Sequence, residues 1–300
     1  MVTSKTDIGI LFDEIITYPV KHEHHKPARE EYIEVEHNVR LHVTDAGDGR
    51  VIVLLHGWPL SDEQYEYQYH DLIYSGFRVV GITMRGFGKS DKPYGLYNYD
   101  IFVKDIKKIL TKLEITDALL GGFSMGGAIA IRYAASDEKN HISQLALFGT
   151  AAPIWTQRDD YPYNLKYDDV NDLIKLCHKD RPQLLFNVGK IFGATETSLS
   201  IGIRNWIYGI GLSSSSNAMA QCLIALRDTD LRADLTKIHI PTIIMHGKHD
   251  KICTFEMAKQ MNLGIKNSEV IPFEKSGHVM FLEETSKFNT ELIKFAREKH

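Results

Sequence analysis

The stretch Gly121-Gly122-Phe123-Ser124-Met125-Gly126-Gly127 most restricts how this chain can fold. It follows an apolar run and precedes a small-residue run at residues 128–135, so the sequence predicts a strand, a sharp turn and a helix. Glycines two residues before and two residues after Ser124 allow the strained backbone and the close strand–helix approach that such a turn requires. The serine is therefore expected to lie exposed on the turn, at the N-terminus of a helix.

Short β-rich runs alternate with amphipathic helical stretches from Glu31 onward, which is typical of a mostly parallel sheet covered by helices on both faces. Two such runs around the turn-prone pair His37-Asn38 predict a hairpin. The expected strands lie at residues 32–35, 41–44, 51–55, 77–82, 118–120, 145–148, 242–245 and 269–271. The clearer helices are expected at residues 100–113, 128–135, 218–226, 254–262 and 286–297. The sequence therefore predicts an α/β fold with an eight-stranded, mostly parallel sheet.

The strand rhythm stops at residues 153–216, where apolar residues fall at helical spacings among Tyr, Phe and Trp. We interpret this segment as a helical cap inserted after the sixth strand. Gly209, Gly211 and the serine run at residues 213–216 predict a flexible exit from the cap. The expected domains are an N-terminal arm (1–30), a core (31–152 and 217–300) and the cap (153–216).

A serine hydroxyl is a weak nucleophile at neutral pH and needs an adjacent base. His278 follows the last predicted strand, and Gly277 before it lets the loop turn the imidazole inward. Asp250 follows the strand at residues 242–245 and supplies a carboxylate that can orient an imidazole. The order Ser, Asp, His along the chain suits a nucleophile on a strand-to-helix turn. We therefore expect Ser124, Asp250 and His278 to act as nucleophile, orienting acid and base.

Other ionisable residues lie near these positions. His246 and His249 are competing imidazoles, but both stand at the end of the same strand as Asp250 and would crowd its carboxylate, so we interpret them as structural. Asp228 and Asp230 are alternative acids that precede the strand instead of following it. The prediction therefore keeps Asp250 as the acid.

Attack on an acyl carbon also needs N–H donors aimed at the oxyanion that forms. The residue after the nucleophile, Met125, offers one backbone N–H. The loop His56-Gly57-Trp58-Pro59, after the third strand, offers another through Trp58. We expect the Trp58 and Met125 amides to form an oxyanion hole.

Charge and hydropathy limit the partners. The formal net charge is −4, acids and bases are interspersed and no Lys/Arg-rich run occurs, so nucleic acid is not an expected partner. The apolar patch at residues 8–12 is too short, and too acidic in its flanks, for a secretory signal. No later run reaches a membrane-spanning length. We expect a cytoplasmic protein with no membrane partner and a small-molecule substrate, and leave open whether it forms a homo-oligomer.

Metal and cofactor sites are not expected. Cys177, Cys222 and Cys253 are odd in number and far apart, which predicts free thiols and neither a disulfide framework nor a zinc site. The histidines at residues 22–25 lack further ligands at metal-binding spacing. We interpret them as part of a solvated N-terminal arm.

Four stretches from Glu31 to the C-terminus share a family likeness: His56-Gly57-Trp58-Pro59-Leu60-Ser61, Arg85-Gly86-Phe87-Gly88-Lys89-Ser90-Asp91, Gly122-Phe123-Ser124-Met125-Gly126, and Thr229-Asp230-Leu231-Arg232 with His246-Gly247. At these residues the chain resembles the α/β-hydrolase superfamily, and within it the cofactor-free haloperoxidase and aryl esterase group. The resemblance implies an α/β-hydrolase fold, a Ser124, Asp250 and His278 triad, and an oxyanion hole from Trp58 and Met125. Epoxide hydrolases and haloalkane dehalogenases of this superfamily carry aspartate where this chain has Ser124, so an alkyl-enzyme is not expected.

The same resemblance implies hydrolysis of small carboxylic esters through an acyl-enzyme, in some members with hydrogen peroxide replacing water to give a peracid. The cap aromatics Trp155, Phe186, Phe192 and Trp206 are expected to line the acyl pocket, although apolar residues at helical spacing also suit a plain core. Two alternatives stay open. A lactonase or carbon–carbon bond hydrolase would use the same triad, and a catalytically silent ligand receptor would retain it without turnover.

Overall fold

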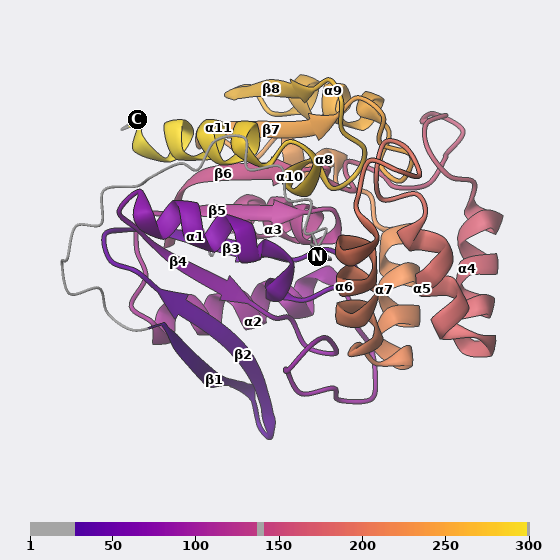
Figure 1. The fold of residues 1–300 in the computed structure, drawn as a ribbon, viewed down its shortest axis with the longest axis horizontal. Helices are drawn as coiled ribbons and strands as arrows, with labels where there is room; N and C mark the ends of the chain where they lie inside the picture. Colours follow the sequence, from indigo (N-terminus) through magenta and orange to yellow (C-terminus); the bar gives the residue numbers. More distant parts are fainter. Residues whose placement is uncertain (1–27, 137–140, 299–300) are drawn as a thin grey trace, which may run out of the picture.

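An eight-stranded sheet in the order β1-β2-β4-β3-β5-β6-β7-β8 forms the centre of the protein (Figure 1). The computed structural model describes residues 28–136 and 141–298. Strands β1 (Arg29–Glu36) and β2 (Val39–Ala46) form the predicted hairpin, and β2 runs antiparallel to β4. The other neighbouring pairs are parallel, among β3 (Arg50–Leu55), β4 (Phe77–Ile82), β5 (Ala118–Phe123), β6 (Ile142–Phe148), β7 (Thr242–Gly247) and β8 (Ser268–Phe273). The predicted fold class and strands are confirmed.

Helices cover both faces of the sheet because its central strands are apolar on both sides. On β3, Ile52 and Leu54 belong to one buried cluster, whereas Val53 and Leu55 belong to the other, as alternation along a strand requires. The first cluster includes side chains of α1 (Glu66–Tyr74) and α11 (Thr285–Arg297). The second includes side chains of α2 (Tyr99–Lys112), α3 (Met125–Ala135) and α9 (Phe255–Gly264). The sheet thus lies between two apolar cores.

Between β6 and β7 the chain forms α4 (Tyr167–Lys179), α5 (Arg181–Gly189), α6 (Ile201–Leu212) and α7 (Ser216–Asp228), which gather at one end of the sheet (Figure 1). The short helices α8 (Arg232–Leu235) and α10 (Met280–Glu283) lie further along the chain. This is the helical insertion after the sixth strand that the sequence predicts. The exact division of the chain into core and cap stays a prediction.

The structure differs from the prediction at the C-terminal end of the cap and at the end of the N-terminal arm. Gly209 and Gly211 lie inside α6, so the flexible exit predicted there is wrong. A Cβ added at Gly211 would lie 3.0 Å from Leu185 Cδ2, which shows that α5 packs closely on α6 at this point. Arg29 already belongs to β1, and the histidine cluster at residues 22–25 lies outside the described residues.

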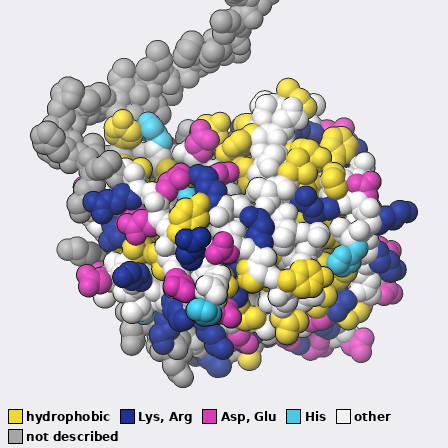
Figure 2. All heavy atoms as spheres, turned by 90° about the horizontal axis from the view of Figure 1, so that it is seen from below, with side chains coloured by type: hydrophobic (Ala, Val, Ile, Leu, Met, Phe, Trp, Pro, Cys, Tyr) yellow, Lys and Arg dark blue, Asp and Glu magenta, His cyan; other side chains and the backbone are white. Residues whose placement is uncertain are grey.

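Among the described residues, no helix is both long and apolar enough to cross a bilayer. On the face shown in Figure 2, basic and acidic side chains lie intermixed. This matches the interspersed charges of the sequence.

The turn from β5 into α3 has the strained geometry that the sequence predicts. Ser124 has φ 52° and ψ −117°, a conformation that non-glycine residues rarely adopt. Its N–H donates to the Phe148 carbonyl at 2.9 Å, which ties the turn to β6. A Cβ added at Gly126 would lie 2.4 Å from the His56 carbonyl oxygen, so only glycine lets α3 approach the end of β3. The glycine thus brings the Ser124 turn against the loop that follows β3.

His56 fixes that loop. Its ring lies fully buried, its Nε2 accepts a hydrogen bond from the Met84 N–H at 2.9 Å, and its Nδ1 lies 2.9 Å from the Gly57 carbonyl oxygen. Burial lowers the pKa of His56 to about 4, although the Gly57 hydrogen bond and the Asp62 charge act in the opposite direction. The neutral ring, with its proton on Nδ1, therefore satisfies both contacts.

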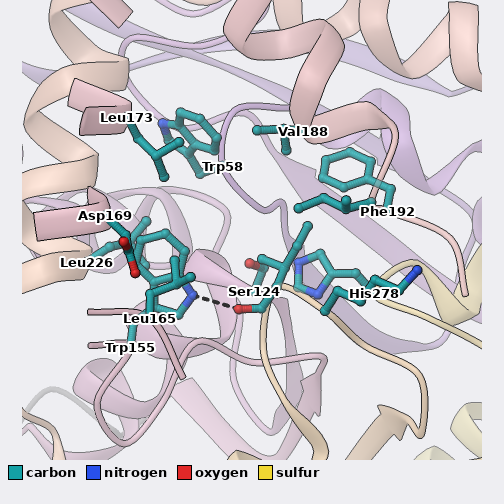
Figure 3. A pocket seen from close by; sticks show the side chains of 13 residues that line it. Trp58, Ser124, Trp155, Leu165, Asp169, Leu173, Val188, Phe192, Leu226 and His278 are labelled. Carbon is teal, nitrogen blue, oxygen red and sulfur yellow. Dashed lines mark hydrogen bonds between the residues drawn. The ribbon is translucent and has the colours of Figure 1, made fainter. Parts of the chain in front are cut away.

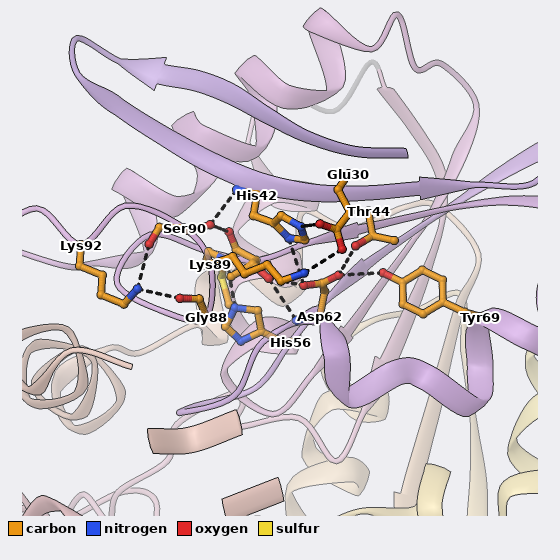
Figure 4. A network of polar contacts seen from close by, with 12 residues as sticks. Glu30, His42, Thr44, His56, Asp62, Tyr69, Gly88, Lys89, Ser90 and Lys92 are labelled. Carbon is orange, nitrogen blue, oxygen red and sulfur yellow. Dashed lines mark hydrogen bonds and ion pairs between the residues drawn. The ribbon is translucent and has the colours of Figure 1, made fainter. Parts of the chain in front are cut away.

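The same loop is held further along by Asp62, a buried carboxylate (Figure 4). Its oxygens accept hydrogen bonds from Thr44 Oγ1 at 2.7 Å, from Tyr69 Oη at 3.1 Å and from Thr83 Oγ1. The His42 ring stands 3.7 Å from the same carboxylate. Together these contacts connect the loop to β2, to α1 and to the end of β4.

Replacing Gly126 by alanine is expected to lower the free energy of unfolding by about 1–3 kcal/mol, because the new methyl group overlaps the backbone at the end of β3. Gly209→Ala is the matched control: its Cβ would meet nothing within 4 Å, and alanine inside α6 should raise stability by up to about 1 kcal/mol. Urea unfolding measures both. Equal effects of the two substitutions would contradict the packing described for the Ser124 turn.

Lowering the pH from 7 to 4.5 should destabilise the protein through His56. The unfolded residue takes up a proton near pH 6.5, whereas the folded one stays neutral down to about pH 4, so the unfolded state binds more protons between these values. The stabilisation is complete above pH 6.5 and is lost as the pH falls toward 4, by roughly 2–3 kcal/mol at pH 4.5. His56→Gln should lose correspondingly less between the two pH values. Equal losses in urea titrations would disprove this role.

Candidate active site

The acid and base predicted from the sequence meet at the carboxyl end of the sheet. Asp250 lies in the loop after β7 and His278 in the loop after β8, and both side chains are buried. His278 Nδ1 is 2.7 Å from Asp250 Oδ2. The other carboxylate oxygen, Oδ1, accepts the N–H groups of Ile252 and Cys253, each at 2.8 Å. The Asp250 carboxylate is therefore fixed on one side by its own loop and faces the imidazole on the other.

The charge of Asp250 is maintained despite its burial. Desolvation alone would raise its pKa, but the charge of His278 and hydrogen bonds from His246 and His278 outweigh that effect and hold the pKa well below its usual range. The carboxylate is thus ionised and accepts the Nδ1 proton of His278. This leaves Nε2 as the His278 nitrogen available for proton transfer.

Ser124 and His278 face one common cavity (Figure 3). The cavity encloses about 180 Å³. The Ser124 residue is only 6% exposed, and it lines this cavity. Two of the three residues predicted as a triad thus line one cavity, and the third, Asp250, contacts His278. Their catalytic roles stay predictions.

The backbone N–H groups predicted as oxyanion donors belong to Met125, which is buried, and to Trp58. Met125 is the first residue of α3, where N–H groups have no intrahelical partner and the helix dipole favours negative charge. Trp58 lines the cavity, and its indole Nε1 donates to the Met219 carbonyl of α7 at 3.1 Å. In the described residues, neither the Trp58 nor the Met125 backbone N–H donates to another protein group. That the two amides form an oxyanion hole stays a prediction.

The wall of the cavity is mainly apolar. Trp155 and Phe192 line it, as the sequence predicts. The remaining apolar lining comes from Trp58, Leu165, Leu173, Val188, Ile191, Leu226 and Ile252. This composition suits an uncharged hydrocarbon or aryl group better than a polar one.

Phe186 and Trp206 do not line the cavity, so their expected place in the pocket is wrong. Phe186 is 52% exposed on α5, and its ring lies 4.6 Å from Lys190 Nζ. Trp206 packs edge-on against Tyr67 of α1, with ring centroids 6.1 Å apart. Both aromatic rings therefore have their contacts outside the cavity of Ser124.

Two charged residues at the cavity were not predicted from the sequence. Asp169 of α4 lines the cavity, and its carboxylate also accepts the Lys166 N–H at 3.0 Å and so caps that helix. Lys251, directly after Asp250, lines it as well. The sequence around Asp169 gives no signal that separates it from an ordinary surface charge. For Lys251, its position next to the predicted acid Asp250 was a usable signal.

The competing residues lie outside the cavity. His246 Nε2 lies 2.6 Å from the Cys253 carbonyl oxygen and 3.4 Å from Asp250 Oδ2, and His249 is exposed. Asp228 pairs with Arg227 at 2.8 Å, and Asp230 pairs with Arg232 at 2.7 Å. None of these four side chains lines the cavity of Ser124. Their interpretation as structural residues therefore agrees with their contacts.

Comparison with known proteins gives one consistent family. Residues 50–285 match the family model of the alpha/beta hydrolase fold. The AB hydrolase superfamily protein YisY of Bacillus subtilis is 44% identical over 88% of this chain and 98% of its own length. An esterase from Exiguobacterium antarcticum has 40% identity, a TM-score of 0.87 and coverage of 90% of this chain and 100% of its own. A bromoperoxidase from Bacillus anthracis has 31% identity, a TM-score of 0.86 and the same coverage. This chain therefore belongs to the α/β-hydrolase family, near its non-haem haloperoxidase group.

Proposed function

We propose that this hydrolase is a serine esterase that cleaves small carboxylic esters through an acyl-enzyme on Ser124. The observation that carries the proposal is the buried 2.7 Å contact between Asp250 and His278 beside a cavity that also holds Ser124. That arrangement gives a hydroxyl nucleophile a base and gives the base an orienting charge. The esterase from Exiguobacterium antarcticum supports the reaction class, because it is so named and is 40% identical.

In the first half of the reaction, Ser124 Oγ attacks the ester carbonyl carbon while His278 Nε2 takes the hydroxyl proton. The ionised Asp250 stabilises the resulting imidazolium. The carbonyl oxygen becomes an oxyanion, which the Trp58 and Met125 amides receive at the positive end of α3. The carbon–oxygen bond then breaks, and the alcohol leaves with the proton from His278.

In the second half, His278 takes a proton from a water molecule as its oxygen attacks the acyl carbon on Ser124. The tetrahedral intermediate is stabilised by the same two amides. Its collapse releases the carboxylic acid and returns the proton to Ser124 Oγ. Hydrogen peroxide in place of water would release a peracid, and the name of the bromoperoxidase relative supports testing it as an acceptor.

The apolar cavity favours small hydrocarbon or aryl acyl groups. A long or strongly polar acyl group would have to displace Trp155, Leu173 or Phe192, which pack around the space. Lactones, and compounds with a hydrolysable carbon–carbon bond, remain competing substrates for the same triad. A panel of acyl and alcohol chain lengths, with and without peroxide, separates these possibilities.

Ser124→Ala should abolish turnover of p-nitrophenyl acetate and labelling by a fluorophosphonate, since both reactions form a bond to Ser124 Oγ. Asp250→Asn should lower kcat by about 10⁴, because the amide no longer fixes the required His278 tautomer. Steady-state kinetics and intact-protein mass spectrometry provide the two measurements.

Ser268→Ala is the matched control, because Ser268 stands at the opposite end of the sheet and donates to the Ile265 carbonyl at 2.7 Å. It should retain wild-type turnover. Unchanged hydrolysis by Ser124→Ala would refute the esterase mechanism. Failure of folded wild-type protein to react with the fluorophosphonate would instead favour a silent ligand receptor.

Leu173→Trp should shift the substrate preference toward shorter acyl chains, because the larger side chain fills part of the cavity. We expect the kcat/KM ratio of p-nitrophenyl hexanoate to p-nitrophenyl acetate to fall about tenfold, corresponding to roughly 1.4 kcal/mol of lost transition-state binding. Phe186→Ala is the control, because that side chain is exposed outside the cavity. A change of the ratio in Phe186→Ala but not in Leu173→Trp would show that the acyl group binds elsewhere.

A further inference from the structure

A short segment of the cap lies directly against the loop that carries His278. We call residues 192–194 the strap and residues 274–279 the histidine loop. The Phe192 carbonyl accepts the backbone N–H of His278 at 2.8 Å and that of Val279 at 3.3 Å. The strap thus holds the main chain of the proposed base itself.

The strap has another role through its side chain. Phe192 lines the cavity, and its ring centroid is 6.0 Å from that of His278 (Figure 3). One residue therefore contributes a wall of the pocket with its ring and fixes the base with its carbonyl. A shift of the strap would change both features together.

The strap has no helix or strand of its own to hold it in place, so its position depends on specific contacts. Glu283, at the end of α10, provides them. Its Oε1 accepts the Ala194 N–H of the strap at 2.8 Å, and its Oε2 accepts the Gly277 N–H of the histidine loop at 2.7 Å. One carboxylate therefore joins the two segments on either side of the contact between Phe192 and His278.

The fit between the two segments is close. A Cβ added at Gly277 would lie 2.5 Å from Ala194 N, so only glycine allows the strap to pack on the histidine loop at this point. Two converging N–H donors also require two acceptor oxygens. A glutamate carboxylate supplies both, whereas a glutamine would turn its NH₂ group toward one of the donors.

We infer that Glu283 is a positioning residue for catalysis. It binds the strap to the histidine loop, so that the pocket wall and His278 keep fixed positions relative to Ser124. This inference rests on the proposed esterase function. It assigns Glu283 no contact with the substrate. Its effect on the reaction passes through the backbone of Gly277, His278 and the strap.

Glu283→Ala and Glu283→Gln should each lower kcat for p-nitrophenyl acetate by roughly 10–100-fold, because small displacements of a catalytic group have effects of this size. For longer acyl esters, which contact Phe192, KM should rise as well. Glu196→Gln is the matched control, because its exposed carboxylate lies just beyond the strap. Wild-type kcat in folded Glu283→Ala protein would overturn the inference and leave Glu283 a stabilising residue only.

Hydrogen exchange tests the same link between the strap and the histidine loop without any substrate. In Glu283→Ala, the backbone amides of the strap and of the histidine loop should exchange faster together, whereas those of α3 and β7 should not change. Faster exchange in only one of the two segments would overturn the inference. This measurement does not depend on turnover, so it tests the role of Glu283 separately from the esterase proposal. The esterase proposal is decided by the Ser124→Ala kinetics.

Discussion

The buried contact between Asp250 and His278 is the interaction on which the site depends. A carboxylate without water must be stabilised by partners, and Asp250 has two backbone N–H groups, the imidazole of His278 and the nearby ring of His246. Loss of any of these partners would leave part of a buried charge unpaired. The loop after β7 and the loop after β8 are therefore held in one arrangement by an electrostatic requirement.

Parallel strands make that arrangement possible. Because β3, β5, β7 and β8 all point the same way, the segments that follow them reach the same edge of the sheet. The Ser124 turn, the Trp58 loop, Asp250 and His278 each occupy one such position. The cap then closes this edge with an apolar wall, so the polar groups of the site meet at the bottom of a cavity and not on an open surface.

The sequence was informative where burial or backbone strain leaves a pattern. Strands buried on both faces appear as apolar runs, and glycines spaced around Ser124 indicate a strained turn. Helix α1 was not predicted, because its buried residues are Gln68 and Leu72, which give no apolar stripe. Phe186 was misplaced because helical spacing does not tell which side of a cap helix faces the site. Glu283 could not be predicted either, since its partners are backbone amides that leave no trace in residue types.

Trp58 connects two properties that are often treated as separate. Its amide borders the proposed oxyanion position, whereas its indole is bonded to the Met219 carbonyl on α7 of the cap. Mutations in α7 that reshape the pocket would therefore also move a donor of the reaction centre. In a laboratory evolution experiment, substrate range and turnover in this protein would change together, and variants that broaden the first without lowering the second would have to leave the turn of α7 around Met219 intact.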